Sequence, residues 1–136
     1  QPAGHDLNTE GFPFYCGRIK LTGSFELSEK PEGRLLVQLN GASMASAGVK
    51  VNRQSCGVIR WRPFVLDITD AARAGSNEIE IEMATTLVNA FGPNRMSRIK
   101  TSEWVGPWEF VDMSRFTDDY QFFDFGMESV SVFAMQ

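Results

Sequence analysis

The stretch from Ala47 to Met83 constrains the fold most, because strand patterns and tight turns follow one another closely within it. Residues 78–83 alternate strictly between Glu and an apolar residue, which is typical of a strand with one solvated and one packed face. Before it, Val49, Val51 and Val58 flank the turn residues 52–55, and this arrangement predicts a hairpin. So dense a succession of strands and turns favours a β-sandwich.

Strand patterns recur on both sides of this stretch, and we predict no helix of ordinary length. Further strands are expected within residues 12–27, 34–39, 64–68 and 120–135. We expect the side chains of Asp67 and Asn77 to bond to nearby turn amides and to have no catalytic role. The fold class that follows is all-β, an antiparallel β-sandwich jelly roll.

The length of 136 residues suits one domain. We expect residues 1–10 to form a flexible N-terminal arm and residues 11–136 to form a single β-sandwich. The beginning of the chain has neither a Met nor the features of a signal peptide, so we expect a mature or excised fragment of a longer protein. Eleven Phe and three Trp predict a core rich in Phe.

Charge and hydropathy argue against two classes of partner. The net charge is −4, which does not suit a nucleic-acid-binding face. No apolar run approaches the roughly 20 residues of a membrane-spanning helix. Two cysteines, Cys16 and Cys56, leave two possibilities open: a disulfide in a secreted protein, or two buried reduced thiols.

The segment from Ala90 to Asp119 has little periodicity and contains two Gly-Pro steps. A loop of this length in a compact domain is usually functional, unless it hides an element such as a short strand over residues 104–111.

Several motifs in a fixed order resemble a known group of domains. GVKVNRQSCG, RPFVLDIT and AGSNEIEIEM are similar to the sugar-binding domain of family 2 glycoside hydrolases. The flanking sequences, GFPFYCGRIKLTGSFEL and LVNAFGPN with the later WVGPWEF, resemble the C-terminal β-sandwich of large rhamnosidase-like glycoside hydrolases. The resemblance covers about 120 residues, an ordinary domain size. It implies a galactose-binding-domain-like fold and a carbohydrate-binding or accessory role.

Three positions depart from the family pattern. Arg53 stands where the family has Gly, Trp61 stands near a more common Tyr, and Asn94 stands where His is usual. These departures bear on the identity of the ligand and not on the fold.

A sugar site needs an aromatic ring for the apolar face of the sugar and polar groups for its hydroxyls. The candidate sugar-binding residues are Trp104, Trp108, Trp61, Arg60, Glu103 and Asn94. The alternative is that Trp104 and Trp108 plug the end of the sandwich and that Trp61 covers the core.

We expect no catalysis by this chain. His5 is its only histidine and lies in the arm, so no Ser/His/Asp arrangement is available. A glycosidase would need two facing carboxylates. Solvated loop charges are the better interpretation of the candidates, which are Glu103, Glu109, Asp112, Asp118 and Asp119.

A structural Ca²⁺ is a further possibility, because sandwiches that resemble this chain often hold one near both chain ends. Asp6, Glu10 and Glu128 could supply carboxylate ligands there. No other cofactor is expected.

The sequence thus predicts a non-catalytic carbohydrate-binding module of a larger glycoside hydrolase that degrades plant-type polysaccharide, in a secreted or periplasmic enzyme. Its partners would be carbohydrate and the catalytic domain of the parent enzyme, with no nucleic acid and no membrane. The alternative is a purely structural accessory domain that packs on the catalytic domain and binds no glycan. An exposed apolar patch would favour this alternative.

Overall fold

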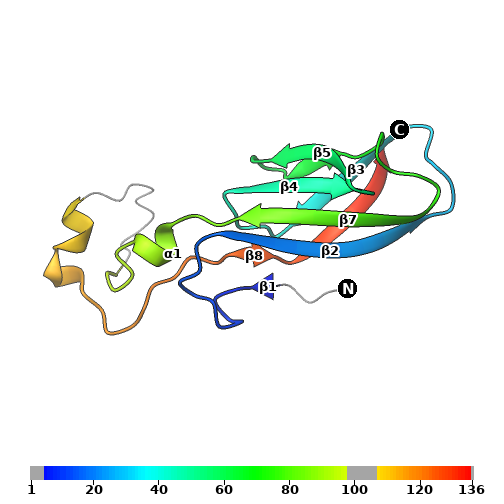
Figure 1. The fold of residues 1–136 in the computed structure, drawn as a ribbon. Helices are drawn as coiled ribbons and strands as arrows, with labels where there is room; N and C mark the ends of the chain where they lie inside the picture. The colour runs from blue at the N-terminus through cyan, green and yellow to red at the C-terminus, as the bar shows by residue number, and fades with distance from the viewer. Residues whose placement is uncertain (1–4, 98–106, 136) are drawn as a thin grey trace.

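The computed structural model describes residues 5–97 and 107–135, and its core is two antiparallel sheets packed face to face (Figure 1). One sheet has the strand order β2-β7-β4-β5 and the other has the order β6-β3-β9. Their bounds are β2 (Arg18–Leu27), β3 (Arg34–Asn40), β4 (Ser46–Val51), β5 (Gln54–Ile59), β6 (Val65–Asp67), β7 (Gly75–Ala84) and β9 (Ser129–Met135). The predicted all-β antiparallel sandwich is confirmed, while its jelly-roll connectivity stays a prediction.

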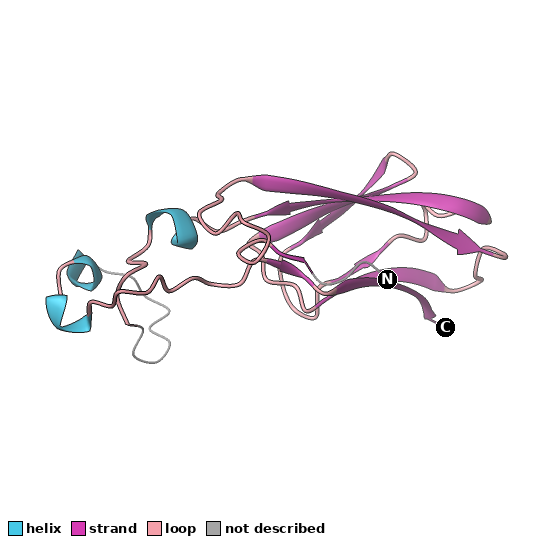
Figure 2. Cartoon of the chain, turned by 90° about the horizontal axis from the view of Figure 1, so that it is seen from below, coloured by secondary structure: helices cyan, strands magenta, loops and turns pink. Residues whose placement is uncertain are grey.

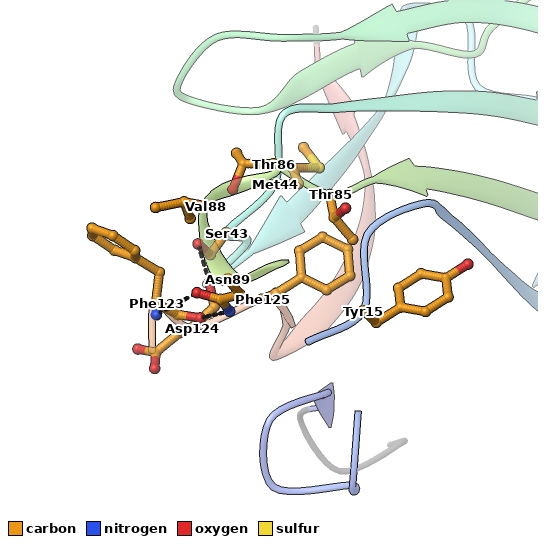
Figure 3. A pocket seen from close by; sticks show the side chains of 10 residues that line it. All are labelled: Tyr15, Ser43, Met44, Thr85, Thr86, Val88, Asn89, Phe123, Asp124 and Phe125. Carbon is orange, nitrogen blue, oxygen red and sulfur yellow. Dashed lines mark hydrogen bonds between the residues drawn. The ribbon is translucent and has the colours of Figure 1, made fainter. Parts of the chain in front are cut away.

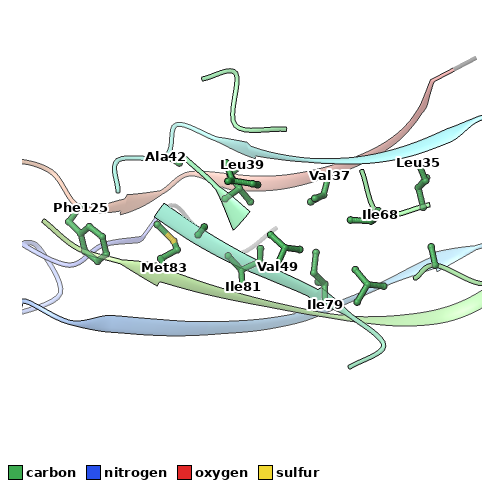
Figure 4. Close-up of a cluster of buried hydrophobic side chains, with 14 residues drawn as sticks. Leu35, Val37, Leu39, Ala42, Val49, Ile68, Ile79, Ile81, Met83 and Phe125 are labelled. Carbon is green, nitrogen blue, oxygen red and sulfur yellow. The ribbon is translucent and has the colours of Figure 1, made fainter. Parts of the chain in front are cut away.

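The core lies between the sheets and consists mainly of aliphatic side chains (Figure 4). Along β7 the apolar positions of the alternating stretch face inward: Ile79, Ile81 and Met83 are buried, and the glutamates between them are not. Opposite them lie Leu35, Val37 and Leu39 of β3. Each such side chain contributes roughly 1.5–3 kcal/mol to folding when it leaves water.

The prediction of a Phe-rich core is wrong. Only Phe125 among the phenylalanines is fully buried. Seven of the eleven are exposed: Phe12, Phe14, Phe91, Phe110, Phe116, Phe123 and Phe133. Strand residues with β-branched or aliphatic side chains already fill the space between the sheets, so the aromatic residues lie elsewhere.

The predicted hairpin joins β4 and β5. Asn52 and Arg53 have φ of 50° and 69°, and two central residues with positive φ define the type I′ turn that matches strand twist. Arg53 adopts this conformation although it has a Cβ, at a position where glycine has no steric cost.

The N-terminal residues attach to the sandwich. β1 (His5–Asp6) pairs antiparallel with β8 (Gly126–Met127), and the N–H of Leu7 donates to the carbonyl of Phe125 at 3.0 Å. The described part of the predicted flexible arm is therefore held against β8.

The two cysteines form no disulfide. Both are free: Cys16 is exposed and Cys56 is half-buried on β5. The expectation of a buried thiol is therefore wrong for Cys16.

Between β7 and β8 the chain leaves the sandwich and projects beyond one end of it (Figures 1 and 2). We call residues 85–125 the extension. Its described parts, 85–97 and 107–125, contain only short helical turns: α1 (Val88–Phe91), η1 (Pro107–Phe110) and η2 (Met113–Arg115). None of the helices described is long and apolar enough to span a membrane. The short strand considered for residues 104–111 does not form over its described part, where η1 lies instead.

Candidate functional site

Asn89, a residue of α1 that is only 6% exposed, joins the two ends of the extension near the place where they leave the sandwich. Its Nδ2 donates to the carbonyl of Phe123 at 2.7 Å and to Oδ1 of Asn8 at 3.2 Å. Its Oδ1 accepts the N–H of Phe123 at 2.9 Å. One amide side chain thus joins the outgoing segment of the extension, its returning segment and the N-terminal segment, and both its nitrogen and its oxygen are hydrogen-bonded.

A hollow of about 280 Å³ lies beside this joint (Figure 3). Its walls are mostly apolar, with hydroxyl groups and one carboxylate among them. The lining residues are Tyr15, Ser43, Met44, Thr85, Thr86, Val88, Asn89, Phe123, Asp124 and Phe125. Two of the hydroxyls already donate to backbone carbonyls: Tyr15 to Arg18 at 2.7 Å and Ser43 to Asp124 at 2.7 Å. These bonds give the hollow a structural role at the joint.

Farther out, cation–π contacts hold the extension together. The Arg95 guanidinium lies 4.8 Å from the ring centroid of Phe116 and 5.6 Å from that of Tyr120. It also donates to the carbonyl of Asp118 at 2.9 Å. Phe14 packs edge-on against Tyr120, with ring centroids 5.3 Å apart, so the segment before β2 supports the same cluster.

The surface of the extension is unusually apolar. Eight large apolar or aromatic side chains of its described parts are exposed, several by two thirds or more: Leu87 63%, Phe91 69%, Phe110 48%, Val111 71%, Met113 67%, Phe116 44%, Tyr120 53% and Phe123 47%. A concentration of this kind marks an interaction surface.

Trp61 lies at the same end of the sandwich, in the loop that follows β5. Its side chain is 81% exposed, so the interpretation that it covers the core is wrong. Arg60 beside it is exposed as well, while the guanidinium of Arg62 lies 5.2 Å from the ring centroid of Phe64. The loop thus presents an indole next to cationic groups, a combination that suits a polar ligand with an apolar face.

The other predicted sugar-binding residues are not assembled around Trp61. Glu103 and Trp104 lie outside the described residues, and so does the side chain of Trp108. Asn94 lies in the extension, where its Nδ2 donates to the carbonyl of Asn89 at 2.7 Å. Its Oδ1 is buried and has no hydrogen-bond partner. Asn94 therefore stabilises the extension through its hydrogen bond to Asn89.

The carboxylates weighed as catalytic pairs are solvent-facing where the structure describes them. Asp112 accepts the N–H of Ser114 and begins η2, the side chain of Asp118 is fully exposed, and Asp119 is exposed. The side chain of Glu109 lies outside the described residues.

The calcium prediction rests on three carboxylates that occupy different settings. Asp6 and Glu128 both line a hollow beside β8, but Glu10 is not among its lining residues. Oδ1 of Asp6 accepts the N–H of Asn8 at 3.1 Å and that of Phe125 at 3.3 Å. Within residues 5–97 and 107–135, no group of three or more His, Cys, Asp or Glu side chains could hold a metal ion. Calcium binding stays a prediction.

The opposite end of the sandwich confirms the hydrogen bonds to turn groups that were expected for Asp67 and Asn77. Oδ1 of Asp67 accepts the hydroxyl and the N–H of Thr69, and its Oδ2 accepts Nε of Arg34 at 2.8 Å. The hydrogen bonds from Thr69, and then that from Arg34, lower the pKa of Asp67 to about 2.

Asn77 is 1% exposed and makes four hydrogen bonds. Its Oδ1 accepts Nδ2 of Asn52 at 2.8 Å and the N–H of Arg73 at 2.9 Å. Its Nδ2 donates to the carbonyls of Arg73 and Gly75. All four hydrogen-bonding positions of this amide are used.

Sequence reasoning missed the two residues that build the extension, Asn89 and Arg95. Asn89 interrupts an apolar run, Leu87-Val88-Asn89-Ala90-Phe91, and an amide in that setting signals a buried hydrogen-bonding role. Arg95 gives no comparable signal, because its aromatic partners lie more than twenty residues away in the sequence.

The fold is similar to parts of two large enzymes. A rhamnosidase from Novosphingobium sp. PP1Y matches with a TM-score of 0.63 and 25% identity, over 88% of this chain and 11% of the rhamnosidase. A β-glucuronidase from Ruminococcus gnavus, in complex with uronic deoxynojirimycin, matches with a TM-score of 0.54 and 18% identity. That match covers 90% of this chain and 20% of the enzyme, and it concerns the fold alone. No protein-family model and no curated protein matches the chain.

Proposed function

We propose that this chain is a non-catalytic accessory β-sandwich of a larger glycoside hydrolase, and that its extension packs against another part of that enzyme. The observation that carries the proposal is the exposure of eight large apolar side chains on the extension. The described parts of the extension, 85–97 and 107–125, contain only short helical turns that leave these side chains exposed, and a second protein surface would remove them from water.

The similarity to part of a rhamnosidase supports a glycoside hydrolase as the parent protein. The chain corresponds to 11% of the rhamnosidase that it resembles, which leaves ample polypeptide to supply a catalytic domain and a docking surface. The exposed carboxylates of the described loops support the absence of catalysis by the sandwich itself, since a glycosidase pair faces its substrate across a cleft. Such a role would place the chain in a secreted or periplasmic enzyme.

The test is binding between the 136-residue chain and the separately expressed remainder of the parent enzyme, followed by isothermal titration calorimetry. The variant Phe91→Ser/Val111→Ser should weaken binding about tenfold or more, because both side chains lie on the extension. A control with the same residue types, Val58→Ser/Phe133→Ser, removes exposed apolar groups from the sandwich, 48% and 38% exposed, and should bind normally. Equal affinity for the two double variants would contradict docking through the extension.

A second function, glycan binding, is favoured by one specific observation, the exposed Trp61 beside Arg60. An indole offers a flat surface for the C–H face of a sugar, and arginine donates to sugar hydroxyls. Titration of plant-type polysaccharides should then give binding that Trp61→Ala and Trp104→Ala variants weaken. If the unmodified chain binds none of them, the domain is an accessory domain only.

A further inference from the structure

Within residues 5–97 and 107–135, no strand pairs with the outer side of β2 or of β9. β2 and β9 are the last strands of their sheets in the described structure, and residues of both strands line one groove. Between them runs a groove of about 300 Å³ whose lining residues carry no charge. These residues are Leu21, Thr22, Gly23, Ser24, Phe25, Ile79, Ile81, Met127, Ser129, Val130, Ser131 and Val132.

Among the described residues, no strand pairs with the backbone groups of β9 that face this groove. In β3, Leu35 and Leu39 bond to the side of β6, where their partners are Ile68 and Phe64. The alternate residues Leu36, Gln38 and Asn40 therefore bond to β9, where the register pairs them with Phe133, Ser131 and Ser129. Every second residue of β9 consequently directs its N–H and C=O toward the open edge: Val130, Val132 and Ala134.

β1 already covers the beginning of this edge. It pairs antiparallel with β8, which directly precedes β9, with Asp6 opposite Gly126. On its other side, Gly126 exchanges two backbone hydrogen bonds with Ser43, which follows β3. β1 thus lies on the side away from β3, and the edge that it occupies continues along β9.

The opposite wall of the groove has a notch. The inward-facing row of β2 consists of apolar residues, Ile19, Leu21, Phe25 and Leu27, and is interrupted at Gly23. Gly23 is exposed although it occupies an inward position, so the row lacks one side chain. A glycine within a strand is typical of a place where another chain approaches closely.

We propose that this open edge binds an extended, uncharged polypeptide strand that runs antiparallel to β9 and adds to the three-stranded sheet. Its backbone bonds to Val130, Val132 and Ala134, and one of its apolar side chains fills the notch at Gly23. Alternate side chains of the added strand face the groove, and the others face solvent. The inference does not rest on the proposed function, because it involves neither the extension nor Trp61.

The test uses the 136-residue chain and a labelled, uncharged probe peptide, acetyl-Thr-Val-Thr-Val-Thr-amide, in fluorescence anisotropy. We expect saturable binding, and we expect Gly23→Leu to weaken it about tenfold by filling the notch. A Cβ at Gly23 would lie 3.7 Å from Ile79 Cγ2, an ordinary contact, so the variant should fold. Ser76→Leu, which adds the same side chain at an exposed position of β7, is the matched control and should bind normally.

Amide hydrogen exchange gives a second, independent measurement. The bound peptide should slow exchange at Val130, Val132 and Ala134 and leave Ser131 and Phe133 unchanged, because the latter two already face β3. Absence of any anisotropy change up to about 1 mM peptide would overturn the proposal, because a Kd above about 1 mM corresponds to less than about 4 kcal/mol of binding free energy. It would also be overturned by equal binding of the Gly23→Leu variant, or by a dimer that protects these three amides without peptide.

Discussion

The two ends of this sandwich use similar residues for opposite purposes. At one end the buried amide of Asn77 closes a turn between strands, so that end is compact and hydrogen-bonded. At the other end the buried amide of Asn89 makes three hydrogen bonds and holds together an extension whose outer surface is apolar and exposed. The difference shows that a buried asparagine can stabilise the fold itself or can present a segment to a partner.

The largest expected effect comes from Asn77→Ala at the compact end. Removing this amide takes one hydrogen bond from Nδ2 of Asn52, and it takes the partner of the N–H and the carbonyl of Arg73. We therefore expect a loss of roughly 3 kcal/mol in the free energy of unfolding. Urea denaturation followed by tryptophan fluorescence measures it. A loss below about 1 kcal/mol, the value typical of a surface hydrogen bond, would mean that the turn does not depend on this amide.

The matched change at the other end is Asn89→Ala, and it should separate local from global stability. We expect the free energy of unfolding, measured with urea, to change by less than about 1 kcal/mol, because the sandwich core does not include Asn89. Limited proteolysis should instead cut residues 85–125 faster than in the unmodified chain. Global destabilisation as large as that of Asn77→Ala would show that the two ends are not energetically distinct.

The sequence predicts these two ends unequally. The strands, the hairpin at Asn52 and the roles of Asp67 and Asn77 followed from alternation and turn chemistry, which act over a few residues. The extension has no comparable pattern in its sequence. Its contacts, such as that between Arg95 and Tyr120, join residues far apart in the chain, and periodicity reports only on near neighbours. The same gap explains the error about Phe: core and interface surfaces favour the same aromatic residues, so composition alone does not separate them.

Acid should weaken the compact end through Asp67. Its pKa is lowered to about 2 in the folded chain by Thr69 and Arg34, so its contribution to stability is present above the ordinary pKa near 4. That contribution is lost as the pH falls toward 2. The variant Asp67→Asn should flatten this part of the stability profile, measured by thermal unfolding between about pH 5 and pH 2. The exposed neighbour Asp70, changed to Asn, is the control, and an identical profile for both variants would contradict the assignment.

The smallest expected effect is a gain. Arg53→Gly should raise the free energy of unfolding by about 0.5–1 kcal/mol, because glycine adopts φ of 69° without the steric cost that a Cβ brings. Gln54→Gly, one residue later in β5, should instead destabilise the chain. Urea unfolding measures both, and a loss of stability in Arg53→Gly would show that the arginine side chain contributes more than its backbone conformation costs.

The central claim is that the compact end is complete in itself and that the extension is made for a partner. Amide hydrogen exchange, measured on the 136-residue chain alone and within the full-length parent enzyme, tests it most directly. We expect residues 107–125 to exchange at least about tenfold more slowly in the enzyme, while residues 75–83 exchange equally in both. Equal exchange of residues 107–125 in the two samples would contradict the account.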